Sequence, residues 1–263
     1  MNKKGFVSLV GAGPGDPDLM TVKAMRLLKD ADVVVYDRLV SADILSLIPT
    51  GISRLSVGKE VGKHCVPQKE INEIIVNLAL AGRKVVRLKG GDPYMFGRGG
   101  EETLALKKHH IDFEVVPGIT AAAGCSAYAG IPLTHRGLSR RVQFITGHFS
   151  NDEPIDLNWS TIADAESTLV IYMGLSTLPQ VIQSLIDAGL PRTTPAAAIQ
   201  NGTTTSQKRV ITQLDKLNDE IHREQMQAPV MIIIGAVVSL ANELDWYQSA
   251  LEENYYEQNI LHR

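Results

Sequence analysis

The chain has 263 residues, 44% of them hydrophobic and 21% charged, and a net charge of −3 at pH 7. A chain of this length and ordinary composition can bury a large core, and we expect two compact lobes. The slightly acidic balance disfavours a nucleic-acid partner. The longest apolar run, residues 230–238, is too short to cross a bilayer and no secretory signal is visible, so we expect no membrane partner and a cytoplasmic location.

Metal and disulfide chemistry are not indicated. The two cysteines, Cys65 and Cys125, lie far apart and form no CxxC pair, which favours a reduced compartment. The seven histidines show no metal-ligand spacing such as HExxH. We therefore predict that the protein holds no metal.

The first half of the chain alternates strands and helices. Apolar runs predict the strands, and apolar positions at helical spacing predict the helices between them. Thr21 is a predicted N-cap, Pro67 opens a helix and Gly82 ends it. The predicted strands are 5–10, 32–36, 53–57, 84–88 and 113–116, and the predicted helices follow Thr21 and cover 41–48, 67–81 and 99–109.

A glycine-proline loop, Gly-Ala-Gly-Pro-Gly-Asp-Pro-Asp, occupies residues 11–18 after the first predicted strand. It matches a dinucleotide-binding fingerprint only in part, because GxGxxG would need glycine in place of Asp16. Pro14 and Pro17 also oppose the smooth entry into a helix that cradles a pyrophosphate. A Rossmann dehydrogenase is therefore disfavoured, although a ligand near this loop remains attractive.

The stretch from Gly90 to Glu102 reads Gly-Gly-Asp-Pro-Tyr-Met-Phe-Gly-Arg-Gly-Gly-Glu-Glu and follows a mostly buried strand. Gly90 and Gly91 let the backbone approach a ligand where a side chain would block it. Glu101 and Glu102 suit the positive end of the helix dipole. A long surface turn is the plain alternative, but this density of glycine at a strand end favours a loop that faces a ligand.

The second half continues the strand-helix rhythm, so we predict an α/β protein. Residues 130–139 break the rhythm with Pro132 and Gly137 and form the predicted linker. The predicted domains are an N-terminal lobe (1–133), a C-terminal lobe (134–245) and a helical or partly disordered tail (246–263). The predicted elements are strands at 142–146, 168–172, 196–200, 208–211 and 230–234, with helices at 177–188 and 214–223.

Taken in order, these loops resemble those of the tetrapyrrole (precorrin) methylase family. The resemblance covers about residues 5–243 and leaves out the tail beyond about 245. Its most specific part is the Lys-Gly-Gly-Asp-Pro run at 89–93 joined to Phe-Gly-Arg-Gly-Gly-Glu-Glu at 96–102, whereas the first loop occurs widely in the wider family. The other matching pieces are Tyr36-Asp37-Arg38-Leu39-Val40, Val57-Gly58-Lys59-Glu60, Pro117-Gly118-Ile119-Thr120, Leu133-Thr134-His135-Arg136, Thr146-Gly147-His148, Tyr172-Met173-Gly174 and Asn201-Gly202-Thr203.

The resemblance implies two α/β lobes of the tetrapyrrole methylase type, with S-adenosyl-L-methionine in the cleft between them, and a homodimer. The implied product of the cofactor is S-adenosyl-L-homocysteine. Most implied contacts supply backbone or small residues, which suits a sulfonium cofactor whose methyl group must stay open toward the second substrate. Met173 reads equally well as core filler. The implied cofactor contacts are Pro14, Gly90, Gly91, Asp92, Met95, Thr120, Ala121, Met173 and Gly202.

The implied reaction is methylation of uroporphyrinogen III at C2 and C7 to give precorrin-2. Pyrrole carbons of a porphyrinogen are electron-rich, so the enzyme contributes chiefly proximity and orientation, together with one modest base. The resemblance implies proton-handling roles for Asp37 and Lys59, and Arg98 beside Glu101 is a further catalytic candidate. Arg98 ranks first, because its permanently charged fork can hold a substrate carboxylate.

Each catalytic candidate has a plainer alternative. Asp37 is also a good turn former, Lys59 reads as a solvated loop charge, and Glu101 stabilises a helix end.

The carboxylates of the implied substrate account for the basic loop residues of a net-acidic chain. Without that substrate, the same residues read as solvated surface. The predicted substrate-binding residues are Arg38, Lys63, His64, Arg136 and Arg140.

Two other functions remain open at this point. One is a related methylase that acts on a later precorrin, on a diphthamide precursor or on ribosomal RNA. The other is a non-catalytic module that binds a tetrapyrrole or a nucleotide, although the intact run from Gly90 to Glu102 argues against it. We see no additional domain for oxidising precorrin-2 or inserting iron, so we expect the methylase alone.

Overall fold

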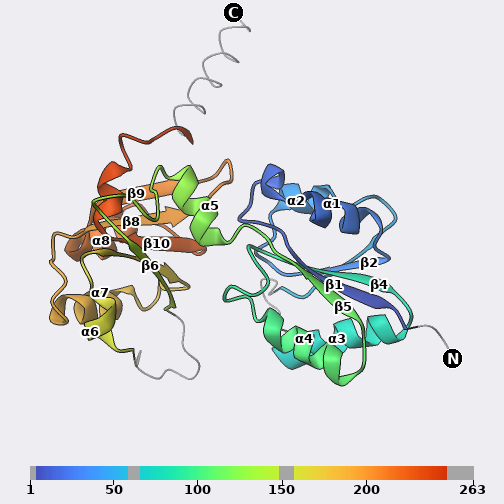
Figure 1. Cartoon of the computed structure of the whole chain (residues 1–263). Helices are drawn as coiled ribbons and strands as arrows, with labels where there is room; N and C mark the ends of the chain where they lie inside the picture. Colours follow the sequence, from blue (N-terminus) through green and yellow to red (C-terminus); the bar gives the residue numbers. More distant parts are fainter. Residues whose placement is uncertain (1–3, 59–65, 148–156, 248–263) are drawn as a thin grey trace, which may run out of the picture. The chain divides into compact units, whose positions relative to one another are not determined.

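The structure is a computed structural model, which describes residues 4–58, 66–147 and 157–247 (Figure 1). The chain divides into two compact units, Met1–Ala121 and Ala122–Arg263. Each unit contains a five-stranded sheet and its own hydrophobic core. The prediction of two α/β lobes is therefore confirmed.

The first unit is built on a parallel sheet with the strand order β3-β2-β4-β1-β5. The bounds agree with the predicted elements to within a few residues. Thr21 caps α1 as predicted, because its hydroxyl accepts a hydrogen bond of 3.1 Å from the Ala24 amide. The elements are β1 (Phe6–Gly11), η1 (Pro17–Leu19), α1 (Val22–Lys29), β2 (Val33–Tyr36), α2 (Ala42–Ser46), β3 (Ser53–Ser56), α3 (Gln68–Leu80), β4 (Lys84–Lys89), α4 (Gly99–Lys108) and β5 (Phe113–Val116).

Helices cover both faces of this sheet. In Figure 1, α1 and α2 lie on one face and α3 and α4 on the other. Alternate strand residues divide between the two cores, since Val34 and Val86 pack with α1 and α2 while Val35 and Val85 pack with the helices opposite. Arg87 follows Val86 in β4, so alternation directs its side chain toward the face that α3 and α4 cover.

The second unit is built on a mixed sheet with the order β6-β7-β10-β8-β9. Strands β6 and β7 are parallel, whereas β10 runs antiparallel to both of its neighbours, β7 and β8. The carboxyl ends of β6, β7 and β8 therefore lie at the same edge. The elements are α5 (Ala121–Tyr128), β6 (Arg141–Thr146), α6 (Trp159–Ile162), β7 (Ser167–Tyr172), α7 (Leu178–Asp187), β8 (Pro195–Gln200), β9 (Lys208–Gln213), η3 (Leu214–Lys216), α8 (Leu217–Arg223), β10 (Val230–Ile234) and η4 (Ala236–Leu240).

Helix α5 is tied to the second unit by specific hydrogen bonds. The Ala122 amide donates to the Tyr172 hydroxyl over 3.2 Å, and the Arg209 guanidinium donates to the Ala129 carbonyl over 2.8 Å. Trp246 donates from its indole to the Ala127 carbonyl over 2.9 Å, which fastens the last described residues to the same helix. The unit boundary thus falls after Ala121, whereas the predicted domain boundary after residue 133 assigns α5 to the first lobe.

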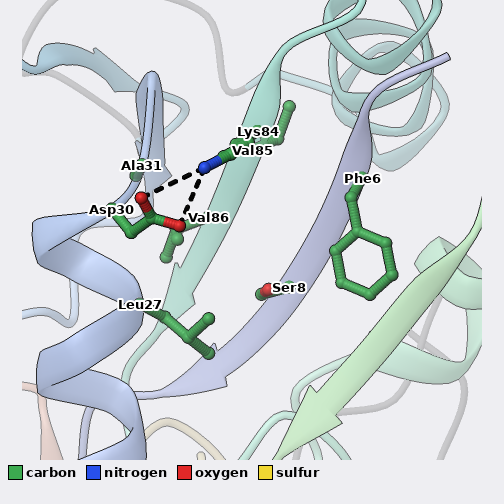
Figure 2. A pocket seen from close by; sticks show the side chains of 8 residues that line it. All are labelled: Phe6, Ser8, Leu27, Asp30, Ala31, Lys84, Val85 and Val86. Atoms are coloured by element: carbon green, nitrogen blue, oxygen red, sulfur yellow. Dashed lines mark hydrogen bonds and ion pairs between the residues drawn. The ribbon is translucent and has the colours of Figure 1, made fainter. Parts of the chain in front are cut away.

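A cavity of about 200 Å³ lies between α1 and the sheet of the first unit, toward the amino ends of β1 and β4 (Figure 2). Its wall is mostly apolar, with Leu27, Phe6 and Val86 among the lining residues. At its rim, Lys84 donates two hydrogen bonds, of 2.9 and 3.1 Å, to the Asp30 carboxylate. The cavity is thus displaced from the carboxyl ends of the strands, where parallel sheets bind their ligands.

The described residues contain neither a membrane-spanning helix nor a metal-binding cluster. No helix there combines the length and the apolar character that a membrane span requires. No group of three or more histidine, cysteine, aspartate and glutamate residues there could hold a metal ion.

Candidate active site

The chain leaves β1 and β4 toward opposite faces of the parallel sheet, although the two strands are neighbours. After β1 it enters α1 on one face, and after β4 it enters α4 on the other (Figure 1). Such a switch in direction is where open α/β sheets bind ligands. The two predicted glycine-rich loops, 11–18 and 90–102, both begin at this point.

The two loops are joined through their main chains. The Gly13 amide donates to the Gly91 carbonyl over 3.1 Å, and the Gly91 amide donates to the Gly13 carbonyl over 2.7 Å. The Ala12 amide also donates to the Lys89 carbonyl over 2.8 Å. Gly13 is thus paired with Gly91, which is a predicted cofactor contact. It also directly precedes Pro14, which is another predicted cofactor contact.

The loop after β5 packs against both of these loops, and at Gly11 the packing leaves no room for a side chain. A Cβ atom on Gly11 would lie 2.5 Å from the Gly118 nitrogen and 2.6 Å from the Gly91 oxygen. Gly91 has a φ of +68°, and a Cβ atom there would lie 3.5 Å from the Ala121 nitrogen and 3.9 Å from the Thr120 Cα. Three predicted cofactor contacts, Gly91, Thr120 and Ala121, are therefore neighbours on a surface made largely of main chain.

Asp92 holds this surface together. One carboxylate oxygen accepts a hydrogen bond of 3.1 Å from the Gly118 amide, and the other accepts one of 2.8 Å from the Tyr94 amide. The carboxylate thus connects the loop after β4 to the loop after β5. The prediction assigned Asp92 to the cofactor, and the structure gives it this internal bracing role. Gly90 and Met95 flank it on the same loop, both half-buried.

Two residues of the β4–α4 loop adopt the left-handed backbone conformation without being glycine. Phe96 has a φ of +51° and Arg98 a φ of +57°, and such residues gather at functional sites because the strain must be held by surrounding structure. Arg98 is exposed and precedes α4 as its N-cap residue. Its guanidinium donates two hydrogen bonds, each 2.8 Å, to the Glu101 carboxylate.

This ion pair changes the protonation of both partners in the expected direction. The hydrogen bond from Arg98 lowers the pKa of Glu101, and the hydrogen bond to Glu101 raises the pKa of Arg98. Both groups therefore stay charged at neutral pH, and the fork of Arg98 is held in one orientation.

Arg87, Lys89 and Glu102 form a cluster of buried charges that was not predicted from the sequence. Glu102 is fully buried, and one of its oxygens accepts hydrogen bonds from Arg87 (3.1 Å) and Lys89 (3.0 Å). Arg87 also reaches the Asp37 carboxylate at the end of β2, over 3.4 Å. The predicted catalytic residue Asp37 is thus connected to α4 through Arg87.

The environment of Lys89 is unusual for a lysine. Desolvation by burial lowers its pKa, and the nearby charge of Arg87 lowers it further, while Glu102 and Asp37 act in the opposite direction. A signal for the cluster exists in the sequence, since Arg87 and Lys89 lie two apart and must share a face in a strand whose only other polar residue is Lys84 at its start. Two such cations on a buried face require an acidic partner.

The second unit carries its own strained loops at the edge where β6, β7 and β8 end. Met173 follows β7 with a φ of +53° and is 51% exposed, so it is not core filler. Asn201 and Thr203 follow β8 with φ values of +49° and +69°. Gly202 lies between them, where a Cβ atom would overlap the sulfur of the buried Cys125. Met173 and Gly202, both predicted cofactor contacts, therefore lie in loops at one edge of this sheet.

The structure places some of the predicted basic residues. Arg38 is exposed at the end of β2 in the first unit, and in the second unit Arg136 is exposed in a turn and Arg140 is exposed directly before β6. Lys59, Lys63 and His64 lie outside the described residues.

Comparison with solved structures first defines the class of protein. One similar solved structure is the native form of the uroporphyrin-III C-methyltransferase of Thermus thermophilus, which is 39% identical with a TM-score of 0.74 over 90% of this chain and 100% of that one. A second structure of that enzyme, complexed with S-adenosyl homocysteine, gives a TM-score of 0.75. A cobalt precorrin-4 methyltransferase is 30% identical, with a TM-score of 0.78 over 89% of this chain and 95% of that one. The fold is thus that of tetrapyrrole-modifying methyltransferases.

The family follows from the sequence comparison. The model of the tetrapyrrole (corrin/porphyrin) methylases matches residues 7–218, and the chain belongs to this family. Curated relatives include the siroheme synthases of Methylococcus capsulatus, 52% identical over 94% of this chain, and of Azotobacter vinelandii, 51% identical over 93%. The chain spans about half the length of these relatives, 52% in both cases.

Proposed function

We propose that the chain transfers methyl groups from S-adenosyl-L-methionine to C2 and C7 of uroporphyrinogen III, giving precorrin-2 and S-adenosyl-L-homocysteine. The observation that carries the proposal is the main-chain surface around the Gly13–Gly91 pairing, at the point where β1 and β4 lead to opposite faces. The similar enzyme of Thermus thermophilus was crystallised with the demethylated form of this cofactor.

The residues of this surface fit such a cofactor. Closely packed glycines expose amide and carbonyl groups, which can hydrogen-bond the amino-acid end and the adenine of the cofactor without large side chains in the way. In the first unit, the proposed contacts are Pro14, Gly90, Gly91, Asp92, Met95, Thr120 and Ala121. Asp92 is a proposed contact that also braces the loops after β4 and β5, because its carboxylate accepts hydrogen bonds from the Tyr94 and Gly118 amides. In the second unit, the proposed contacts are Met173 and Gly202.

When bound, S-adenosyl-L-methionine supplies an electrophilic methyl group, and the residues of the chain must orient the substrate and remove a proton. We assign Arg98 to orientation, because Glu101 fixes a guanidinium that can still hold a substrate carboxylate with its free donors. We assign Asp37 and Lys59 to proton handling after the carbon–carbon bond forms. Glu101 acts through Arg98.

The carboxylates of the macrocycle require cations. We propose Arg38, Lys63, His64, Arg136 and Arg140 for this task, on the basis of the family resemblance and of the exposure of those that the structure describes. A homodimer, a cytoplasmic location and the absence of nucleic-acid and membrane partners complete the proposal.

The test is methyl transfer to uroporphyrinogen III under oxygen-free conditions, followed by mass determination of the product. We expect a product that carries two added methyl groups and forms only when S-adenosyl-L-methionine is present. Binding of the cofactor in calorimetry without any methylated product would contradict the proposal and favour a non-catalytic binding module.

A second candidate is methylation of a later precorrin. Its support is the likeness to the cobalt precorrin-4 methyltransferase, which has the highest TM-score of the structures compared above. Uroporphyrinogen III and a later precorrin offered in equal amounts would separate the two candidates, since the preferred substrate is consumed first.

A further inference from the structure

Glu102 is the centre of the buried charge cluster. One oxygen of its carboxylate accepts three hydrogen bonds, from Arg87 (3.1 Å), from Lys89 (3.0 Å) and from the Gln68 side chain (3.3 Å). The other oxygen is buried and has no hydrogen-bond partner among the described residues. Glu102 thus joins α4, β4 and α3 through a single atom.

Arg87 carries this connection to the proposed site. Its Nε donates to Glu102, and its two terminal nitrogens donate to residues at the ends of β2 and β4. One donates to the carbonyls of Leu88 (3.1 Å) and Val35 (3.4 Å), and the other donates to the Asp37 carboxylate over 3.4 Å. The guanidinium therefore spans the distance between a fully buried glutamate and a half-buried aspartate.

Stability alone is a poor explanation for this cluster. Well-packed apolar side chains usually hold a helix on a sheet at least as well as a buried ion network, and a buried oxygen without a donor is unfavourable. What an ion network provides instead is a defined orientation for each charged group. The group at its exposed end is Asp37, which is the proposed proton acceptor.

The two consecutive glutamates of α4 hold different arginines. Glu101 points outward and holds Arg98 by two hydrogen bonds, while Glu102 points inward and holds Arg87. Both proposed groups, Arg98 and Asp37, are therefore anchored to the first turn of the same helix, directly after the glycine-rich loop.

We propose that Glu102 is a positioning residue for methyl transfer, which acts through Arg87 to hold the Asp37 carboxylate at the end of β2. This inference rests on the proposed function, because it takes Asp37 to be the proton acceptor. Glu102 itself is buried and touches no substrate.

The kinetic test is a double-mutant cycle. Glu102→Gln keeps the shape of the side chain and removes its charge, and we expect kcat to fall by about 10- to 100-fold while the cofactor Kd changes by less than about threefold. The double variant Glu102→Gln/Asp37→Asn should be no slower than Asp37→Asn, because Glu102 acts only through that carboxylate. Losses that multiply in the double variant would overturn the proposal, and so would an unchanged kcat in Glu102→Gln.

Glu114→Gln is the matched control. Glu114 is a partly buried glutamate of the same sheet, which accepts a hydrogen bond of 3.0 Å from Ser8 and pairs with Lys23. We expect its kcat to stay within about twofold of the wild type, since its side chain contacts Ser8 and Lys23 and belongs to no side-chain network with Arg87 or Asp37 among the described residues. If Glu102→Gln does not fold, Arg87→Lys replaces it in the same cycle, because lysine keeps the charge and loses the fork.

A measurement without turnover separates this proposal from the proposed function. The NMR chemical shift of the Asp37 side-chain carboxyl carbon should change in Glu102→Gln and stay unchanged in Glu114→Gln. An unmoved resonance in Glu102→Gln overturns the positioning role, whether or not the wild type methylates uroporphyrinogen III. If the wild type does not methylate it, the proposed function falls and the resonance still decides the coupling.

Discussion

Arg98 and Glu101 form a two-point ion pair in which both hydrogen bonds measure 2.8 Å, although Arg98 lies in the left-handed region of backbone conformation. The pair closes the glycine-rich loop onto the first turn of α4 and leaves the guanidinium more than half exposed, at 57%. An arginine held in a fixed orientation at the surface is prepared for a second carboxylate.

The first prediction concerns this arginine. Arg98→Ala should lower kcat by roughly 100-fold and leave the cofactor Kd within about threefold, because orientation of the substrate is lost while the main-chain surface stays intact. The free energy of unfolding should change by less than about 1 kcal/mol, since exposed ion pairs contribute little. Steady-state kinetics and calorimetry check the prediction, and unchanged turnover would remove Arg98 from the mechanism.

A second prediction follows from the crowded main chain. Gly11→Ala should destabilise the protein by about 2–4 kcal/mol and weaken cofactor binding, because the added methyl group would press on the Gly118 nitrogen and the Gly91 oxygen. Gly100→Ala is the control, since nothing lies within 4 Å of its added Cβ and it sits in the first turn of α4. It should stabilise by up to about 1 kcal/mol. Equal denaturation midpoints for both variants would contradict the packing described here.

A third prediction concerns Gly202 and Cys125. Gly202→Ala should destabilise the protein by about 1–3 kcal/mol, because the new Cβ atom would overlap the buried sulfur. Adding Cys125→Ala should recover part of this loss, since the substitution removes the overlapping atom. Urea unfolding of both single variants and the double variant checks the coupling, and additive effects would show that the two sites do not touch.

A fourth prediction concerns how stability depends on pH through Lys89 and Lys84, the two lysines at opposite ends of β4. Burial lowers the pKa of Lys89, so between that lowered value and 10.5 the unfolded state binds more protons than the folded state, and the Lys89 contribution to stability rises with pH. The substitution Lys89→Met removes this pH-dependent contribution. The free energy of unfolding of the variant, measured from pH 7 to pH 10, should therefore rise less, or fall more, than that of the wild type.

Lys84 provides the opposite sign for comparison. The hydrogen bond to Asp30 raises the pKa of Lys84, so its contribution is fully present below pH 10.5 and is lost as pH rises through the folded-state pKa. Lys84→Met should therefore follow the wild type between pH 7 and pH 10. If both variants show the same slope in this range, the pH effect does not come from the burial of Lys89.

Local sequence patterns predicted most of the fold because the elements are short, regular and clearly bounded. Thr21 as an N-cap and Gly82 as a helix stop act within one turn of chain, and both occupy those positions in the structure. The glycine-rich loops were found for the same reason, since glycine at the end of a buried strand is itself the signal.

The buried charge cluster was not predicted, because its members meet only through the order of the strands. Arg87 and Glu102 are separated by a loop and a helix turn, and Asp37 approaches Arg87 because β2 pairs with β4 with Val35 opposite Arg87. The strand order β3-β2-β4-β1-β5 is a property of the whole unit and cannot be read from any single stretch of the sequence. Position 102 therefore looked like an ordinary acidic start to a helix.

The Gly13–Gly91 pairing has a consequence for mutational mapping. Systematic replacement by alanine finds important positions by trimming side chains, and here there is nothing to trim. Such a survey would detect Asp92, whose carboxylate braces the loops after β4 and β5, but at the paired glycines alanine adds atoms instead of removing them. Mutational surveys of this protein should therefore include substitutions that enlarge residues as well as substitutions that shorten them. Otherwise the contribution of the main-chain surface will be underestimated relative to that of the charged side chains.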